Sequence, residues 1–123
     1  MNKFITIINF NRMNKVIRTY ILKNKLIIGK CDSTIHNNIG YINSINIISQ
    51  FRNQRLGDKL LKKTEEVIIE NFKVSSINIL VWNKMNTDLI NFYIKNNYKV
   101  IENNNIYDDG EYIYDLINVK KIV

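Results

Sequence analysis

The sequence lacks proline and contains one cysteine, Cys31, and one histidine, His36, among its 123 residues. A single cysteine excludes a disulfide within the chain, and a single histidine excludes a metal site built from several histidines. No apolar run approaches the roughly 18–20 residues that a membrane-spanning helix needs. Residues 1–7 lack the long apolar segment and small-residue cleavage site of an export signal. We therefore expect a reduced, cytoplasmic protein with no membrane partner and no metal.

The composition is that of an ordinary globular protein. Hydrophobic residues make up 46% of the chain and charged residues 24%, which excludes a disordered chain. The length fits a single domain over residues 1–123. The lack of proline and the abundance of asparagine and isoleucine are typical of a genome poor in G and C, so we interpret most surface Asn and Lys as codon bias.

Positive charge is concentrated in the first half of the chain. The net charge is +7, and residues 1–63 carry twelve of the 18 basic side chains but only Asp32 and Asp58 of the 11 acidic ones. This asymmetry indicates an anionic partner, or else only a solvated basic face. Nucleic acid is not the partner we expect, because no known binding motif or aromatic stacking platform accompanies the charge.

The first half has the composition and alternation of β-strands. It predicts strands at residues 4–10, 15–22, 26–32 and 39–48, the second and third being antiparallel neighbours. The polar residues 33–38, which include His36, are expected to form a loop with a solvated histidine. We expect Cys31 to be a small buried side chain, because no basic group is obviously placed to lower its pKa.

The second half changes period and predicts two helices. Apolar spacing from Leu56 predicts a helix over residues 56–71, and an apolar strand follows at 76–82. A second helix is expected from residues 86–88 to 95, with Leu89, Ile90, Tyr93 and Ile94 facing inward. Strands at 98–107 and 111–119 flank a hairpin turn at Asp109-Gly110. The fold class is therefore α+β: a mixed, mostly antiparallel sheet flanked by two main helices, in the order β-β-β-β-α-β-α-β-β.

The turn into the first helix has the chemistry of an anion site. A helix N-terminus presents unpaired N–H groups and a partial positive charge, which together attract phosphate. Arg52 and Arg55 add guanidinium donors, and Gly57 allows a ligand to approach the backbone closely. An ordinary strand-to-helix turn with surface arginines is the alternative.

Two segments resemble the signatures of the GNAT superfamily of acyl-CoA-dependent N-acetyltransferases. Residues 52–57 resemble its pyrophosphate loop, Arg/Gln-x-x-Gly-x-Gly/Ala: Arg52 and Gly57 match, and Arg55 replaces the first glycine. Residues 86–98 resemble its second signature, Asn-x-x-Ala-x-x-Phe-Tyr-x-Lys-x-Gly-Phe. In that segment Asn86, Phe92, Tyr93 and Lys95 match, whereas Leu89, Asn97 and Tyr98 replace the family residues. The resemblance covers about residues 15–119 and implies a GNAT-like sheet.

The resemblance implies that acetyl-CoA is the co-substrate and that its acetyl group passes by direct attack to a primary amine, on a small molecule or a protein. Acetyl-CoA binding is then assigned to the backbone of Ile45, Asn46 and Ile47, to Arg52, Asn53, Gln54, Arg55, Leu56, Gly57, Asp58 and Lys59 at the pyrophosphate, and to Asn86 and Lys95. The N–H of Asn46 or Ile47 would polarise the thioester carbonyl.

Catalytic roles follow from the same resemblance. Tyr93 would be the general acid, since a phenol with a pKa near 10 keeps its proton at neutral pH and can give it to a departing thiolate; a purely structural core tyrosine is the alternative. Asn43 stands where the family often has a glutamate base. Asn43 and Ser44 could position a water but not keep a proton, so the sequence leaves the base open.

Two departures from the family pattern shape the expectations. Only residues 11–14 separate the first two predicted strands, so the two helices that the family places there and that help shape its acceptor site are missing. The acceptor side is then expected to be open, or completed by a partner chain as in a homodimer. Asn43 in place of glutamate supports an alternative function, a catalytically degenerate acyl-CoA-binding or regulatory module of the same fold.

Overall fold

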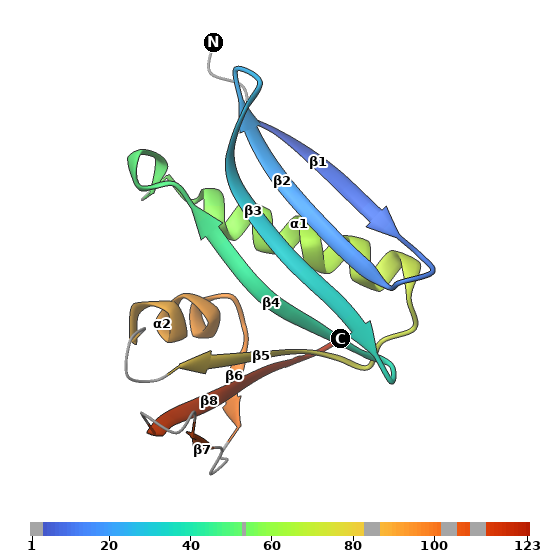
Figure 1. The fold of residues 1–123 in the computed structure, drawn as a ribbon, viewed down its shortest axis with the longest axis vertical. Coiled ribbons are helices and arrows are strands. Elements are labelled where there is room, and N and C mark those ends of the chain that lie inside the picture. Colours follow the sequence, from blue (N-terminus) through green and yellow to red (C-terminus); the bar gives the residue numbers. More distant parts are fainter. Residues whose placement is uncertain (1–3, 53, 83–86, 102–105, 109–112) are drawn as a thin grey trace.

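The computed structural model describes residues 4–52, 54–82, 87–101, 106–108 and 113–123 (Figure 1). Its elements, in chain order, are β1 (Phe4–Asn11), β2 (Val16–Lys23), β3 (Leu26–His36), β4 (Ile39–Ile47), the short 3-10 helix η1 (Ser49–Phe51), α1 (Leu56–Asn71), β5 (Ser76–Trp82), α2 (Thr87–Lys95), β6 (Lys99–Ile101), β7 (Ile106–Asp108) and β8 (Ile113–Ile122).

The strands form one mixed sheet in the order β1-β2-β3-β4-β5-β8-β6, with β7 paired to β8. Only β4 and β5 pair in parallel among the described strands, and all the other pairs are antiparallel. The predicted fold class, α+β with a mixed, mostly antiparallel sheet, is confirmed. β1 and β2 are joined directly through residues 12–15 without a helix, as the sequence predicted.

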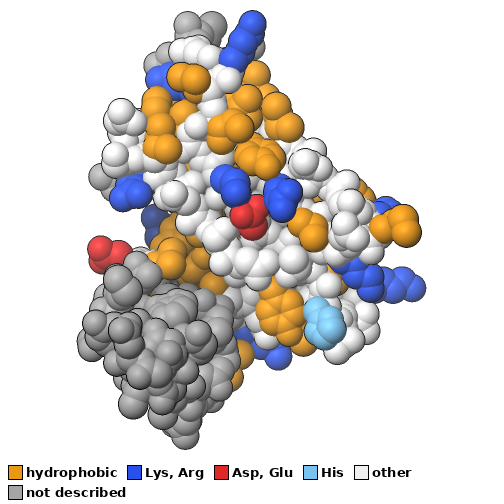
Figure 2. Space-filling model, viewed as in Figure 1, with side chains coloured by type: hydrophobic (Ala, Val, Ile, Leu, Met, Phe, Trp, Pro, Cys, Tyr) orange, Lys and Arg blue, Asp and Glu red, His pale blue; other side chains and the backbone are white. Residues whose placement is uncertain are grey.

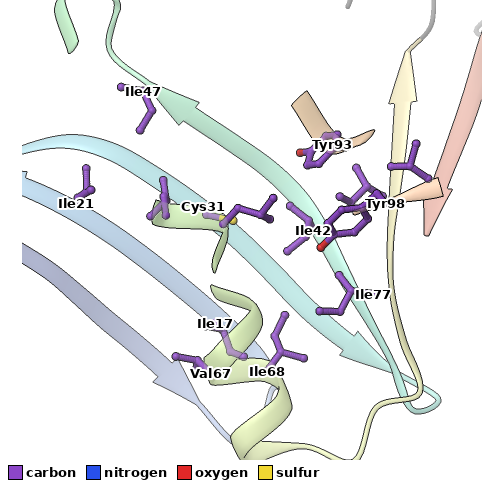
Figure 3. Close-up of a cluster of buried hydrophobic side chains, with 14 of the residues drawn as sticks. Ile17, Ile21, Cys31, Ile42, Ile47, Val67, Ile68, Ile77, Tyr93 and Tyr98 are labelled. Carbon is purple, nitrogen blue, oxygen red and sulfur yellow. The ribbon is translucent and has the colours of Figure 1, made fainter. Parts of the chain in front are cut away.

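Helix α1 covers one face of β1–β4, and the opposite face carries no helix among the described segments (Figure 1). In β2, Ile17, Thr19 and Ile21 point to the α1 side and are fully buried, while the intervening side chains point to the other face. The predicted apolar stripe of α1 is buried against them: Leu56, Leu60, Leu61, Thr64, Val67 and Ile68. Figure 3 shows this core extending to Tyr93 of α2 and to Tyr98.

A buried polar network links α1 to the far end of the sheet. Tyr98 donates its hydroxyl to Glu65 over 2.6 Å, and Lys121 of β8 donates to the same carboxylate over 3.2 Å. Because a buried carboxylate is costly unless it is paired and hydrogen-bonded, these two partners allow Glu65, only 7% exposed, to lie inside the core. Thr64 likewise donates to Thr19 across the helix–sheet interface.

Two local predictions need correction. Residues 33–38 are not a loop, because β3 continues to His36 and only Asn37 and Asn38, both with positive φ, form the turn. Ser33 fits a buried strand position because its hydroxyl donates to the Ile17 carbonyl. His36 lies exposed at the end of β3.

Ile94 does not face inward. Its side chain is 47% exposed, because the buried face of α2 is centred on Ile90 and Tyr93. Of the strand predicted over residues 98–107, the structure describes β6 and β7, and residues 102–105 lie outside the described residues. The Asp109-Gly110 turn lies outside the described residues, although β7 and β8 pair as the two arms of a hairpin would.

The buried thiol of Cys31 gives the fold a pH dependence. Burial, with a smaller contribution from nearby carboxylates, raises the pKa of Cys31 to about 12. Below the usual thiol pKa of about 8.5 both folded and unfolded chains keep this proton; above it only the unfolded chain releases it, so stability falls as pH rises. We expect unfolding free energy to fall between pH 8.5 and 10 by up to about 1.4 kcal/mol per pH unit from this group.

Thermal and urea unfolding of the wild type and Cys31→Ala across this pH range measures the effect. The variant is expected to be less stable at pH 7 but to lose less stability between pH 8.5 and 10. Equal slopes for the two proteins would contradict the assignment to Cys31.

Candidate functional site

The site is organised by the point at which β4 and β5 separate. The two strands pair only from Ile39 to Ile42 on β4 and from Ser76 to Ile79 on β5. Beyond this point β5 continues beside β8, while residues 43–47 of β4 keep β3 as their only strand partner among the described strands. A stretch of strand edge is therefore left open inside the sheet, and its backbone groups can bind an extended ligand.

A β-bulge at Asn43 sits at the start of this opening. Asp32 of β3 pairs with Ser44 and the next residue, Ser33, pairs with Ile42, so Asn43 is the extra residue. The bulge places Asn43 and Ser44 together on the exposed face, where Asn43 donates to the Thr34 hydroxyl over 3.1 Å. It also turns Ile45 and Ile47 toward the core. Bulges that redirect side chains in this way are frequent next to active sites.

The turn of residues 52–55, here called the anion-binding turn after its predicted role, leaves the first backbone N–H groups of α1 without a capping side chain. The N-cap residue, Arg55, makes no side-chain capping hydrogen bond, so the first N–H groups remain free for a ligand. Arg52 is fixed nearby by donating its Nε to the Ile47 carbonyl over 2.9 Å. This bond ties the turn to the end of β4 and leaves the terminal nitrogens of the guanidinium for an anion.

Arg55 occupies a backbone conformation that favours glycine. Its φ of 58° and ψ of 21° lie in the left-handed region, where a residue with a Cβ is strained by about 1–2 kcal/mol. This is the position at which the family loop pattern has a glycine.

Gly57 also has a packing role that the sequence did not reveal. A Cβ at this position would lie 3.3 Å from the Phe92 ring, so glycine allows the close packing of α1 on α2; its predicted role beside an anion stays a prediction. Asp58, in the same helical turn, accepts from Asn96 over 2.9 Å and lies 3.8 Å from the Lys95 ammonium. The Lys95 ammonium therefore lies beside the first turn of α1.

Tyr93 lies on the core side of the opening. Its side chain is 1% exposed and packs edge-on against Tyr98, with ring centroids 5.6 Å apart. In Figure 3 it projects from α2 with its hydroxyl directed to the side of β4. Burial raises the pKa of Tyr93 above its usual value, so the phenol keeps its proton throughout the neutral and mildly alkaline range.

Asp32 is a candidate site residue that the sequence reading missed. It lies on the exposed sheet face opposite α1, where Ser44 donates to its Oδ2 over 3.3 Å. Lys30 lies 3.3 Å and Arg18 3.5 Å from its carboxylate oxygens; Figure 2 shows this acidic group between two basic ones. The available signal was that Asp32 is the only acid before Asp58.

Other predicted positions lie elsewhere or outside the description. Asn53 and Asn86 fall outside the described residues. Gln54 and Lys59 are exposed beside the anion-binding turn, and Leu56 is buried beneath it. A surface hollow lined by Asn38, Ile69, Phe72, Lys73, Val74 and Ser75 lies at the opposite end of α1 and belongs to none of these groups.

Two further features concern membranes and metals. No helix within the described ranges is long and apolar enough to cross a membrane. Among the same residues, no group of three or more His, Cys, Asp or Glu side chains could hold a metal ion.

Residues 7–98 match the model of the acetyltransferase (GNAT) family. The chain belongs to this family. The fold of this GNAT protein is also that of solved acetyltransferases at low identity. The PaiA N-acetyltransferase of Thermoplasma acidophilum, in complex with coenzyme A, has a TM-score of 0.73 and 17% identity, over 89% of this chain and 62% of that one. No curated protein matches the sequence.

Two other solved structures show the same similarity. A GNAT acetyltransferase of Elizabethkingia anophelis with acetyl-CoA bound has a TM-score of 0.74 and 16% identity, over 90% of this chain and 78% of that one. The ribosomal-protein-S18-alanine N-acetyltransferase of Escherichia coli has a TM-score of 0.71 and 15% identity, over 86% and 68%. The GNAT chain thus spans about three fifths of the Thermoplasma enzyme and more of these two.

The strained arginine of this GNAT protein supplies a test of the anion-binding turn. We expect Arg55→Gly to leave the fold equally stable or up to about 1 kcal/mol more stable, because it removes the left-handed strain. The same change removes a charged phosphate donor, so CoA affinity should fall about tenfold or more. Urea unfolding measures the stability of the variant. Isothermal titration with CoA and with pantetheine, which lacks the pyrophosphate, measures its affinity for each ligand.

Lys62→Ala, on the exposed face of α1, is the matched control and should bind CoA normally. Pantetheine should bind Arg55→Gly and the wild type equally. Unchanged CoA affinity in Arg55→Gly would show that the pyrophosphate does not bind at this turn.

Proposed function

We propose that the protein is an N-acetyltransferase that transfers the acetyl group of acetyl-CoA to a primary amine by direct attack, with Tyr93 as the general acid. The observation that carries this proposal is the opening between β4 and β5, which has a buried phenol on its core side and polar groups on its exposed side. Family membership supports acyl transfer, and the uncapped helix α1 supports an acyl-CoA with a pyrophosphate.

The backbone and the anion-binding turn would hold the co-substrate in an extended form. Residues 43–47 present a strand edge to which the amide groups of pantetheine can hydrogen-bond in place of a missing strand. Arg52, Arg55 and the first N–H groups of α1 bind the pyrophosphate, with Lys95 close by. The N–H of Asn46 or Ile47 would stabilise the oxyanion formed when the amine attacks, an effect worth about 3–4 kcal/mol in comparable sites.

The acceptor would approach over the exposed face of β4. The opposite side of this strand is closed by the core, in which Ile42 and Ile47 are buried, whereas Asn43, Ser44 and Asn46 are exposed. The attacking amine must lose a proton as the C–N bond forms. Ser44 accepts it and passes its own hydroxyl proton to Asp32, whose carboxylate it already contacts. Asp32 would then be the base, a role that Asn43 cannot fill.

Tyr93 completes the reaction on the other side. As the C–S bond breaks, the phenol gives its proton to the leaving thiolate and regains one from solvent after product release. Burial makes the phenol a weaker acid by raising its pKa. The same dry surroundings also disfavour the charged thiolate and so raise the pKa of the thiol that accepts the proton. Asn43 serves here as a positioning residue, through its hydrogen bond to Thr34.

A second candidate function is favoured by Asn43, which stands where the family often has glutamate. The protein would then be a degenerate acyl-CoA-binding module without turnover. Acetyl-CoA consumption measured with amino acids, polyamines and N-terminal peptides separates the two. Tight CoA binding with no turnover on any amine would favour the module.

Removal of the Tyr93 hydroxyl tests the general acid. Tyr93→Phe should lower kcat about 100-fold, in the range of general acid catalysis, and leave CoA affinity unchanged. Because burial raises the pKa of Tyr93 above its usual value, wild-type kcat should show no alkaline loss below about pH 10. Equal turnover in the variant would remove Tyr93 from this role.

Replacement of Asp32 tests the proton acceptor. Asp32→Asn should lower kcat/KM for the amine about 100-fold near pH 7, and the loss should shrink as pH approaches the pKa of the acceptor amine, which then needs less help. Ser44→Ala should show the same trend, and Glu66→Gln, on the exposed face of α1, should behave as wild type. A defect of equal size at all pH values would make Asp32 a structural ion-pair residue only.

A further inference from the structure

Strand β1 forms one edge of the sheet and carries none of the features that usually protect such an edge. It pairs with β2 over its whole length, from Phe4 to Asn11, and no described strand pairs with its other side. Its sequence, FITIINFN, contains no charge and no proline, and its register with β2 is unbroken by a bulge. Charge, proline, bulges and short length are the means by which proteins keep edge strands from pairing.

The side chains of β1 are also unusually apolar for an exposed edge. On the face opposite α1, Ile5 is 58% and Ile7 47% exposed. On the α1 side, Phe4, Ile8 and Phe10 are only half-buried against the core. Figure 2 shows hydrophobic side chains gathered over the β1 side of the exposed face. Both faces of the edge therefore offer apolar surface that a further strand would cover.

We propose that β1 pairs antiparallel with β1 of a second copy of this chain, so that the two sheets become one continuous sheet about a two-fold axis at Ile7. A two-fold axis perpendicular to the sheet keeps each face continuous, since residues that face each other then point to the same side. An uncharged strand of this kind meets itself without placing like charges opposite one another.

The register centred on Ile7 fits the side chains best. It places Ile7 opposite Ile7 of the second copy on the exposed face, and Phe4 opposite Phe10 on the α1 side. Each aromatic already has one neighbour: Phe10 packs edge-on against Phe72 at 5.5 Å, and the Lys23 ammonium lies over Phe4 at 5.7 Å. A cross-strand aromatic pair covers the open side of both rings and stabilises such a contact.

The electrostatic cost of this arrangement is small. Each copy has a net charge of +7. The pairing brings Lys23 of one copy toward Arg12 of the other, and Arg12 lies over the Phe10 ring of its own chain. These side chains are solvent-facing and screened within about 8 Å at physiological ionic strength. Because a single strand pair is smaller than a standard interface, we expect weak and reversible association that depends on protein concentration. This pairing does not depend on acyl transfer.

Cysteine cross-linking tests the register. Opposite residues of an antiparallel pair have Cα atoms about 4.5–5.5 Å apart, which is within disulfide range. Ile7→Cys should therefore form a disulfide-linked dimer under mild oxidation at least tenfold faster than either of two control variants. These are Ile5→Cys, whose cysteine would face Asn9 of the second copy, and Met13→Cys, which changes a 93% exposed residue in the turn after β1. The native Cys31 is buried and does not interfere. Equal or faster cross-linking at position 5 or 13 would overturn the proposed pairing.

Sedimentation equilibrium of the full chain tests the dimer itself. The wild type should be a reversible dimer at 100 μM, Ile7→Lys should be a monomer, and Ile69→Lys, which changes a 49% exposed isoleucine on α1, should dimerise as wild type. A wild-type monomer at 100 μM, or a dimer that survives Ile7→Lys, would overturn the proposal. If Ile7→Lys does not fold, the cross-linking rates decide.

Discussion

Strand β4 pairs with β5 for only four residues, and the place of every candidate site residue depends on where that pairing ends. Up to Ile42 the two strands satisfy each other's backbone groups, as strands inside a sheet must. Beyond Ile42 the edge of β4 is free to bind a ligand. α1 begins shortly after β4 ends, and Arg52 ties the connecting turn to Ile47. The strand edge and the helix N-terminus are therefore neighbours, and together they form the binding surface that we propose for the co-substrate.

Several features of this surface lower the stability of the fold. Arg55 adopts a left-handed conformation that glycine would adopt without strain, and the bulge at Asn43 interrupts the ladder between β3 and β4. Asp32 lies between Arg18 and Lys30 on a sheet face where uncharged side chains would avoid desolvation. These costs are offset by a dry core on the opposite face, which holds both helices and the buried pair Tyr98 and Glu65 in place.

Much of the fold follows from the sequence, and most of the site does not. The boundaries of α1 and β5 were predicted correctly, because the apolar residues of α1 have helical spacing and β5 is a short apolar run. The prediction of a loop at residues 33–38 was wrong because it rested on the polar character of Ser33 and His36. The Ser33 hydroxyl is satisfied inside the sheet by the carbonyl of Ile17, which is far away in the sequence. The bulge left a readable signal, since the apolar positions of β4 switch from Ile42 to Ile45 and Ile47. Asp32 was missed because Ser44 and Arg18, which contact its carboxylate, lie on other strands.

Amide chemical shifts during a titration with acetyl-CoA test the central claim most directly, because they report on the open edge of β4 without requiring turnover. The largest shifts are expected at residues 43–47 and in the first turn of α1, from Leu56 to Asp58, with little change along β1 and β2. Shifts confined to other parts of the chain, or no binding at all, would contradict a co-substrate site between β4 and β5.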